Sequence, residues 1–467
     1  MSSKESSFQI NEQELLELEK DESVLLFDLR LKSNYESSHI PGAAHAVCDA
    51  RAKETIMPKL PKNVKIILID DDGSMAGEIV TMMRSFGLDA YFLKGGMNNW
   101  SGKTVQGTYH DSIKPDTLWN KIKTNNVFLL DVREPDEFSD FKIPGSVNIP
   151  LQDLFTKDAS SKIPKDKEII TICPHGNRAM IATFALARNE IKSHTLEGGL
   201  AGWSQVLNYT KASENPTVYQ IEKVGKGCLS YVVESDGKAI VIDPLFPAEK
   251  YQEIAAKEKF EIINVINTHQ HADHISGAKK LSEITNSAWF ESGLETWDFE
   301  TNFLKDGDEI SFGSSKLRAI HTPGHTPGSL SYVVDEKVVF TGDILFVESI
   351  GRPDLRDKAE EFAADLYESL HNKLLKLPPE IMVFPAHHGE LVKSQNEVFS
   401  ITIDKAKNHD ILKLSKEDFI KEIVNLSIPR PMNYQKIIQI NKGSEPLVAE
   451  NIPDLELGPN RCSVSGV

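Results

Sequence analysis

Three histidines and an aspartate lie within six consecutive positions of this 467-residue chain, at His269, His271, Asp273 and His274. The cluster follows the apolar run 262–266, which predicts a buried strand that ends where the cluster begins. Neutral imidazole and carboxylate groups suit zinc, iron or manganese, and loops at strand ends are a usual place for such sites. The cluster therefore predicts a metal site.

Three later loops offer ligands of the same kinds. His325 lies in a loop rich in proline and glycine, and the prolines fix its direction at low entropic cost. Asp343 and His387 each come shortly after an apolar run that reads as a strand. Four strand-end loops that each offer histidine or aspartate indicate one metal centre built from distant parts of the chain.

A second constellation combines a thiol with a cation, at Cys173 and Arg178. The segment between them follows a predicted strand at 168–172 and precedes a predicted helix at 179–189. A short glycine-bearing loop that enters a helix turns several backbone N–H groups toward one point. The helix dipole and nearby cations should lower the pKa of a thiol there, so the loop predicts a nucleophilic thiolate or a bound anion.

The first half of the chain repeats itself at a constant spacing of 103 positions, from Asp28 to Asp131 and from Trp100 to Trp203. A period of this size indicates a duplicated domain, and each copy alternates strand-like and helical stretches that favour a parallel sheet covered by helices. In the first copy, Asp70 stands where the second has Cys173. Its acidic loop would repel anions, so we expect this copy to be inactive and to serve packing or partner docking.

The second copy resembles the rhodanese family, whose members are sulfurtransferases that carry sulfane sulfur as a cysteine persulfide. The resemblance rests on segments 131–134, 143–145, 173–178 and 197–203. It implies that Cys173 carries the persulfide and that Arg178 orients the anion. Asp131 and Arg133 are expected to tie the strand end to neighbouring loops.

The second half of the chain resembles the metallo-β-lactamase fold, an αββα sandwich with its metals at one end of the sheets. In the family pattern one site takes His269, His271 and His325, and a second takes Asp273, His274 and His387, with Asp343 between them. The fold hosts hydrolases and oxygenases, so it leaves the reaction open.

Segments 350–355 and 418–432, with a weaker echo at 460–462, resemble the persulfide dioxygenases. This resemblance implies one Fe(II) on a facial triad of two histidines and a carboxylate, which leaves positions open for substrate and O₂. The implied ligands are His269, His325 and Asp343, with Arg352 binding substrate and with His271, Asp273, His274 and His387 orienting ligands and water. The segment 388–390 departs from the glutathione-using members and favours another carrier thiol.

These resemblances together predict a persulfide dioxygenase fused to a sulfurtransferase. It would oxidise a low-molecular-weight thiol persulfide with O₂ to sulfite and thiol, while Cys173 moves sulfur between persulfide, sulfite and thiosulfate in either direction. One alternative is a thioester hydrolase resembling glyoxalase II, with two zinc ions. Segment 351–354 and the fused rhodanese domains speak against it. Another alternative treats the N-terminal half as a docking and sulfur-relay module.

The composition favours a soluble cytoplasmic enzyme. A net charge of −17 argues against nucleic acid or a membrane surface as the main partner. The four cysteines are far apart without a CxxC pair, so neither disulfides nor a thiolate zinc site is predicted. Cys48 and Cys228 read as packing residues, no leader or membrane span is evident, and a homo-oligomer remains open.

The predicted architecture is α/β and α+β with three domains. An inactive rhodanese-like domain spans residues 1–105, an active one spans 106–210, and a metallo-β-lactamase-fold domain spans 217–467. Polar residues and a proline predict a linker at 208–216, and Asp236-Gly237 predicts a hairpin turn. The segment after Ser444 lacks periodicity, and we expect it to wrap a neighbouring domain or to stay disordered.

Overall fold

The computed structural model divides the chain into two compact units, with the boundary between Trp203 and Ser204. The described residues are 8–18, 24–46, 48, 52–107, 111–124, 126–155, 162–188, 191–353, 358–389, 398–426 and 429–464. Within these ranges, no helix has the length and apolar character needed to cross a membrane.

The first repeat is a five-stranded parallel sheet with the strand order β1-β5-β4-β2-β3. Parallel neighbours need crossover connections, and helices supply them. The strands are β1 (Gln9–Ile10), β2 (Val24–Asp28), β3 (Ala43–His45), β4 (Lys65–Ile69) and β5 (Asp89–Leu93). The helices are α1 (Glu12–Leu18), α2 (Lys32–Ser37), η2 (Ala52–Ile56), η3 (Met57–Lys59), α3 (Ser74–Ser85) and η4 (Gly96–Asn99).

The second repeat has the same topology, in the order β6-β10-β9-β7-β8, which confirms the predicted duplication. Its strands are β6 (Asp111–Ile113), β7 (Val127–Asp131), β8 (Val147–Asn148), β9 (Glu168–Ile172) and β10 (Ser193–Leu196). Its helices are α4 (Pro115–Ile122), α5 (Pro135–Asp140), η5 (Leu151–Phe155), α6 (Asn177–Arg188) and α7 (Gly199–Trp203). Strand β9 and helix α6 flank the Cys173 loop as predicted.

One hydrophobic core joins the two repeats. Its buried side chains include Leu60 and Val80 from the first repeat and Leu151 and Ile169 from the second. Because a contiguous core holds packed elements in fixed positions, side chains near this junction keep defined places relative to both repeats.

The C-terminal unit begins with a seven-stranded mixed sheet whose strands follow chain order from β11 to β17. These strands are β11 (Leu207–Glu214), β12 (Thr217–Lys223), β13 (Cys228–Ser235), β14 (Lys238–Ile242), β15 (Glu261–Ile266), β16 (Ala288–Ser292) and β17 (Asn302–Leu304). The linker predicted at 208–216 is wrong, because β11 covers most of it and pairs antiparallel with β12. Its polar residues are those of an edge strand with solvent on one face. The hairpin turn at Asp236-Gly237 is confirmed, with positive φ at both residues.

The second sheet has six strands, again in chain order. They are β18 (Glu309–Phe312), β19 (Ser315–His321), β20 (Leu330–Val334), β21 (Val338–Gly342), β22 (Met382–Pro385) and β23 (Ile401–Thr402). The helices of the unit are α8 (Glu249–Glu258), α9 (Ala278–Thr285), α10 (Ala359–Glu368), η7 (Ser369–Lys373), η8 (Leu374–Lys376), α11 (Ile403–Ala406), η9 (Asp410–Lys413), α12 (Lys416–Asn425), α13 (Tyr434–Lys442), η10 (Ala449–Asn451) and α14 (Ile452–Leu455).

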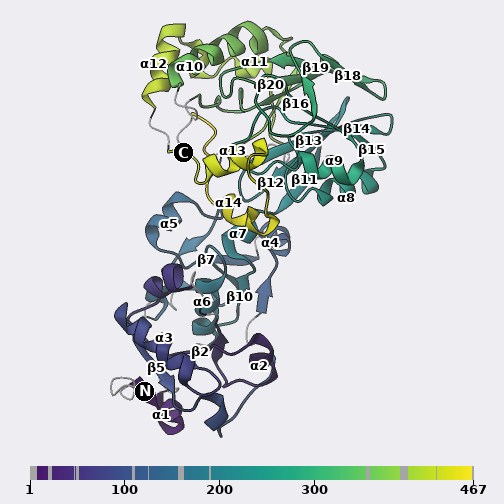
Figure 1. The fold of residues 1–467 in the computed structure, drawn as a ribbon. Coiled ribbons are helices and arrows are strands. Elements are labelled where there is room, and N and C mark those ends of the chain that lie inside the picture. Colours follow the sequence, from purple (N-terminus) through teal and green to yellow (C-terminus); the bar gives the residue numbers. More distant parts are fainter. Residues whose placement is uncertain are drawn as a thin grey trace. The chain divides into compact units, whose positions relative to one another are not determined.

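The two sheets stack between layers of helices. Alternation along β13 sends Tyr231 and Val233 into the core between the sheets, whereas Val232 faces the core under α8 and α9. A third core packs α10 and α12 against the other sheet, so helices cover both outer faces (Figure 1). This arrangement confirms the αββα sandwich.

Candidate metal centre and thiol site

The loop after β15 carries the clustered histidines and is anchored at its first residues. Asp243 follows β14 and accepts hydrogen bonds from the backbone nitrogen of Thr268 at 2.6 Å and from its hydroxyl at 2.8 Å. The Tyr332 hydroxyl donates to the Asn267 carbonyl at 2.7 Å. Because all these groups are buried, their pairing fixes the start of the loop and with it the direction of His269.

Three predicted ligands from three loops come together at one point. The Nε2 atoms of His269 and His325 lie 3.7 and 3.5 Å from Oδ2 of Asp343, and each residue is about 1% exposed. Among the described residues, none donates a hydrogen bond to or accepts one from these three atoms. Buried polar atoms without partners are costly, so their convergence fits a bound metal ion.

The hydrogen bonds on the far side of each imidazole set the tautomer that metal binding needs. Nδ1 of His325 donates to the Arg352 carbonyl at 2.8 Å. The Thr268 hydroxyl gives its proton to Asp243 and therefore accepts from Nδ1 of His269 at 2.9 Å. Both rings then present the lone pair of Nε2 toward Asp343.

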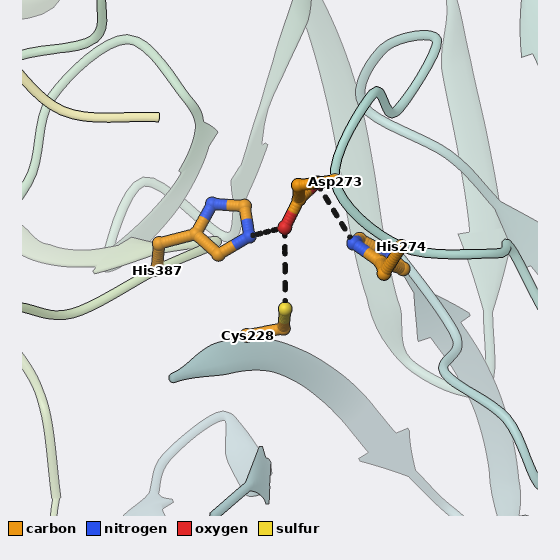
Figure 2. Close-up of side chains that lie close together, drawn as sticks. All are labelled: Cys228, Asp273, His274 and His387. Carbon is orange, nitrogen blue, oxygen red and sulfur yellow. Dashed lines mark hydrogen bonds and ion pairs between the residues drawn. The ribbon is translucent and has the colours of Figure 1, made fainter. Parts of the chain in front are cut away.

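A second group of buried side chains is centred on Asp273 (Figure 2). Its Oδ2 accepts from Nε2 of His387 at 2.8 Å and from the Cys228 thiol at 3.3 Å, and its Oδ1 lies 3.1 Å from Nδ1 of His274. In contrast to Oδ2 of Asp343, both carboxylate oxygens of Asp273 have hydrogen-bond partners, whereas Nε2 of His274 has none among the described residues.

His387 links the two groups, because its Nδ1 also donates to Oδ1 of Asp343 at 2.6 Å. Burial lowers the pKa of His387, but Asp343 and Asp273 outweigh burial and the pKa is raised well above its ordinary value. A cationic His387 donates from both ring nitrogens, which neutralises one carboxylate and orients the other.

His271 lies beside His269 but is turned toward another partner. Its Nε2 is 3.1 Å from Oδ1 of Asp243. Burial lowers the pKa of His271, yet the Asp243 carboxylate outweighs burial and raises it. His271 therefore supports the loop through Asp243, and it is absent from the convergent group of His269, His325 and Asp343.

Two cysteines border the centre, and the sequence pattern did not indicate them as site residues. Cys228 opens strand β13 and looked like an ordinary core thiol, but it donates to Asp273. The sulfur of Cys462 lies within 4.8 Å of ligand atoms of Asp343 and His387. Burial and the nearby carboxylates raise the pKa of both thiols. No spacing rule could have placed them, because their neighbours come from other loops.

Arg352 holds the C-terminal tail rather than reaching open space. Its guanidinium Nη1 donates to the carbonyls of Pro429 and Arg461, and its backbone nitrogen donates to the Cys462 carbonyl at 3.0 Å. The side chain is 1% exposed, so these contacts support a role in positioning the tail. Substrate binding by Arg352 stays a prediction. Asp354 and Leu355 of the same motif lie outside the described residues.

The C-terminal segment also holds the histidine loop in place through hydrogen bonds to the loop backbone. Asn441 Nδ2 donates to the carbonyls of His271 and His274, and Glu456 accepts from the backbone nitrogen of Ile275 at 2.8 Å. Glu456 forms a fully buried ion pair with Lys223. The segment after Ser444 therefore packs on its own unit, and the expected wrapping of a neighbour or disorder is wrong for the described part.

The Cys173 loop turns backbone N–H groups onto sulfur, as predicted. Sγ of Cys173 accepts from the backbone nitrogens of Gly176 at 3.2 Å and Ala179 at 3.3 Å. The predicted lowering of the thiol pKa is wrong, however. Burial raises the pKa of Cys173, and the backbone donors and Arg178 offset only part of this effect.

Arg178 lies at the start of α6 and is paired with a carboxylate. Its Nη1 and Nη2 donate to the two oxygens of Glu137, each at 2.8 Å. Burial raises the pKa of Glu137, but Arg178 and Lys59 outweigh it and lower the pKa to about 2. Sequence reasoning missed Glu137, although it belongs to the helix α5 that follows the Asp131-Arg133 pair. That pair ties the strand end to the Phe141 carbonyl, as expected.

The first repeat uses the same two backbone donors for a different acceptor. The Asp70 carboxylate accepts from the backbone nitrogens of Gly73 and Ala76, which stand 103 positions before Gly176 and Ala179. Met75 replaces Arg178 and is 43% exposed. This loop is therefore occupied by its own side chain.

Comparisons with known proteins agree with this division. The Rhodanese-like domain model matches residues 11–103 and 114–206, and the Metallo-beta-lactamase superfamily model matches residues 224–387. A crystal structure of ETHE1 from Myxococcus xanthus aligns with a TM-score of 0.43 and 28% identity, covering 51% of this chain and 99% of that one.

Two curated relatives match the C-terminal unit. The human mitochondrial persulfide dioxygenase ETHE1 is 31% identical over 208 residues, covering 44% of this chain and 78% of the relative. A hydroxyacylglutathione hydrolase of Francisella tularensis subsp. novicida is 32% identical over 236 residues, covering 49% and 88%. The chain belongs to the persulfide dioxygenase family of the metallo-β-lactamase superfamily and carries two rhodanese-like domains before that unit.

Proposed function

We propose that the C-terminal unit is an iron-dependent persulfide dioxygenase with one Fe(II) on His269, His325 and Asp343. The observation that carries this proposal is the convergence of three buried donor atoms for which no hydrogen-bond partner is found among the described residues. Two histidines and one carboxylate form the ligand set of non-haem Fe(II) oxygenases. Such an ion would supply a redox centre with open positions for a persulfide and O₂.

The state of the second ligand group supports a single metal. Asp273 already bonds to His274, His387 and Cys228, so a second ion on this carboxylate would have to displace these contacts. His387 donates to Asp343 and leaves Oδ2 of that carboxylate free to bind. The group thus acts as a rigid support for the ligand.

The reaction converts one persulfide, one O₂ and one water into one thiol, one sulfite and two protons. The terminal sulfur is oxidised and O₂ is reduced. The chain contributes geometry and protons: Thr268 and the Arg352 carbonyl orient the histidines, and His387 holds a proton between Asp343 and Asp273. Burial of all these groups excludes bulk water from the reacting atoms.

The carrier thiol is proposed to be a small thiol other than glutathione. His388, at the segment that departs from the glutathione-using members, stacks on Phe399 with ring centroids 3.7 Å apart and contacts Glu222 at 3.1 Å. This places an aromatic pair and a carboxylate where that segment begins. Glu390 of the same segment lies outside the described residues.

We further propose that the second rhodanese domain is a sulfurtransferase with Cys173 as persulfide carrier and Arg178 beside it. Its donors and acceptors would be persulfide, sulfite and thiosulfate, with the direction of transfer open. Two backbone N–H groups directed at Sγ are suited to an anionic sulfur. The three predicted domain boundaries, the cytoplasmic location and a homo-oligomer also stay predictions.

A hydrolase with two zinc ions is the second candidate function. The four-residue group around Asp273 and the triad around Asp343 together contain the expected ligands of a binuclear site except His271, which contacts Asp243 instead, and the Francisella relative is a hydrolase. In such a hydrolase a second metal ion would replace the hydrogen bonds within the Asp273 group.

Metal analysis combined with O₂ uptake separates the two functions. The substrates tested are glutathione persulfide and coenzyme A persulfide. We expect one iron per chain, O₂ consumption that is slower with glutathione persulfide, and sulfite as product. Two zinc ions per chain with thioester cleavage would support the hydrolase. If the iron-loaded protein consumes no O₂ with any low-molecular-weight persulfide, the dioxygenase proposal is wrong.

A further inference from the structure

Arg178 does not give the Cys173 loop a free positive charge. Its side chain is 6% exposed and makes two parallel bonds to Glu137. A bidentate pair of this kind is strong and cancels both charges at a distance. An anion that approaches the Cys173 loop would therefore meet a neutral pair.

A third charge from the other repeat changes this balance. Nζ of Lys59, at the end of η3 in the first repeat, lies 3.2 Å from Oε2 of Glu137. Two cations and one carboxylate leave one net positive charge at the edge of the Cys173 loop. The Lys59 side chain is 38% exposed, so its charge also faces solvent, where a dissolved anion can encounter it.

The segment that carries Lys59 is fixed against the second repeat. Met57 and Leu60, on either side of it, are buried in the same core as Leu151 and Leu154. Asn63 also donates to the Gln152 carbonyl at 3.5 Å. Packing therefore holds Lys59 beside Glu137, although the ion pair itself is partly exposed and would be weak alone.

We infer that the first repeat, whose own loop is filled by Asp70, supplies Lys59 as the cation that recruits sulfur oxyanions such as thiosulfate and sulfite to Cys173. The inference rests on the proposed sulfurtransferase function and adds a specificity residue to it. The thiol site is thus composite: the second repeat provides the sulfur and its backbone donors, and the first provides the net positive charge. The duplicated domain keeps a functional role without a nucleophile.

Kinetics of sulfur transfer from thiosulfate to cyanide test this role in the full-length protein. We expect Lys59→Met to raise KM for thiosulfate by about two- to fivefold, with kcat little changed, since the charge acts on approach of the anion. Lys59→Arg should restore KM. The matched control is Lys62→Met, which removes an exposed lysine three positions away, and high salt should abolish the difference between the two variants.

Alkylation of Cys173 gives a second readout that needs no turnover. Iodoacetate is an anion and iodoacetamide is neutral, and both react with the same thiolate, so the ratio of their rates reports the charge at the loop. We expect Lys59→Met to lower this ratio by about two- to fivefold and Lys62→Met to leave it unchanged. The mass of the peptide that contains Cys173 separates it from the other three cysteines.

The two readouts distinguish failure of the inference from failure of the function beneath it. If the wild-type protein transfers no sulfur from thiosulfate, the proposed sulfurtransferase function is wrong. The ratio of alkylation rates would still test whether Lys59 attracts anions to Cys173. An equal ratio in the wild type and in Lys59→Met would overturn the recruiting role, whatever the turnover.

Discussion

The two repeats build the same anion loop and fill it differently. In both, a strand leads into a turn whose backbone N–H groups point to the side chain at the end of that strand. That side chain is Asp70 in the first repeat and Cys173 in the second. The Asp70 carboxylate accepts both backbone hydrogen bonds and completes the loop as structure, whereas sulfur can accept and release a further atom. The comparison teaches that the exchange of Asp70 for Cys173, together with the Arg178–Glu137 pair beside the thiol, separates a structural loop from a chemical one.

Replacing the sulfur should have the largest effect. We expect Cys173→Ser to lower sulfur transfer from thiosulfate at least about a thousandfold, because the hydroxyl cannot carry sulfane sulfur. The assay measures thiocyanate formed from cyanide. Asp70→Cys is the matched change in the first repeat, and it should create no activity on the Cys173→Ser background, since Met75 and Asn34 replace the Arg178–Glu137 pair. Activity in that double variant would break the comparison.

Removing the carboxylate should cost more stability than removing the sulfur. Asp70→Ala leaves two buried backbone N–H groups without an acceptor, and we expect the free energy of unfolding to fall by about 3 kcal/mol. Cys173→Ala should cost less, about 1 kcal/mol, because sulfur is a weak acceptor. Denaturant unfolding measures both values. Equal losses would contradict the stronger hydrogen bonds that we assign to the Asp70 carboxylate.

The Glu137 pair should make the stability of the second repeat sensitive to acid. With a pKa lowered to about 2, the Glu137 carboxylate contributes stability that is full above its ordinary pKa of 4.5 and is lost as the pH falls toward 2. We expect the stability difference between the wild type and Glu137→Gln to shrink over that interval. Unfolding curves at several pH values measure it, and a difference independent of pH would contradict the ion pair.

Adding a cation to the first loop should have the smallest effect. Met75→Arg places a guanidinium at a position that is already exposed and has Asn34 in place of a carboxylate partner. We expect the free energy of unfolding to change by less than about 0.5 kcal/mol, with no gain in sulfur transfer. Thermal unfolding and the thiocyanate assay check this. A clear gain in activity would show that Asp70 does not block the loop.

Local patterns predicted the elements well, because they report on short stretches of chain. The alternation around β13, the run before His269 and the loop before α6 all lie within about ten residues of the side chains they position. The strand-end loops indicated one shared metal centre, and the choice of His269, His325 and Asp343 came from the resemblance to the persulfide dioxygenases. The αββα sandwich was predicted from the resemblance of the ligand-bearing loops to the metallo-β-lactamase fold.

The contacts that were missed join residues far apart in the sequence. Strand β11 has a polar sequence and exists because β12 offers it an edge. Glu137 meets Arg178 across 41 positions, and its own helix gives no sign of that partner. The pKa of Cys173 follows from complete burial, which the loop sequence does not report. Each of these is set by tertiary packing.

The bonds from Asn441 and Glu456 to the histidine loop have a consequence for biosynthesis. Asn441 and Glu456 lie about 170 to 180 positions after the loop residues to which they bond. At a synthesis rate of roughly 5–20 residues per second, the loop emerges about ten to forty seconds before its partners exist. The histidines are thus made early and assembled late. We therefore expect the metal proposed for His269, His325 and Asp343 to bind after synthesis of the chain is complete.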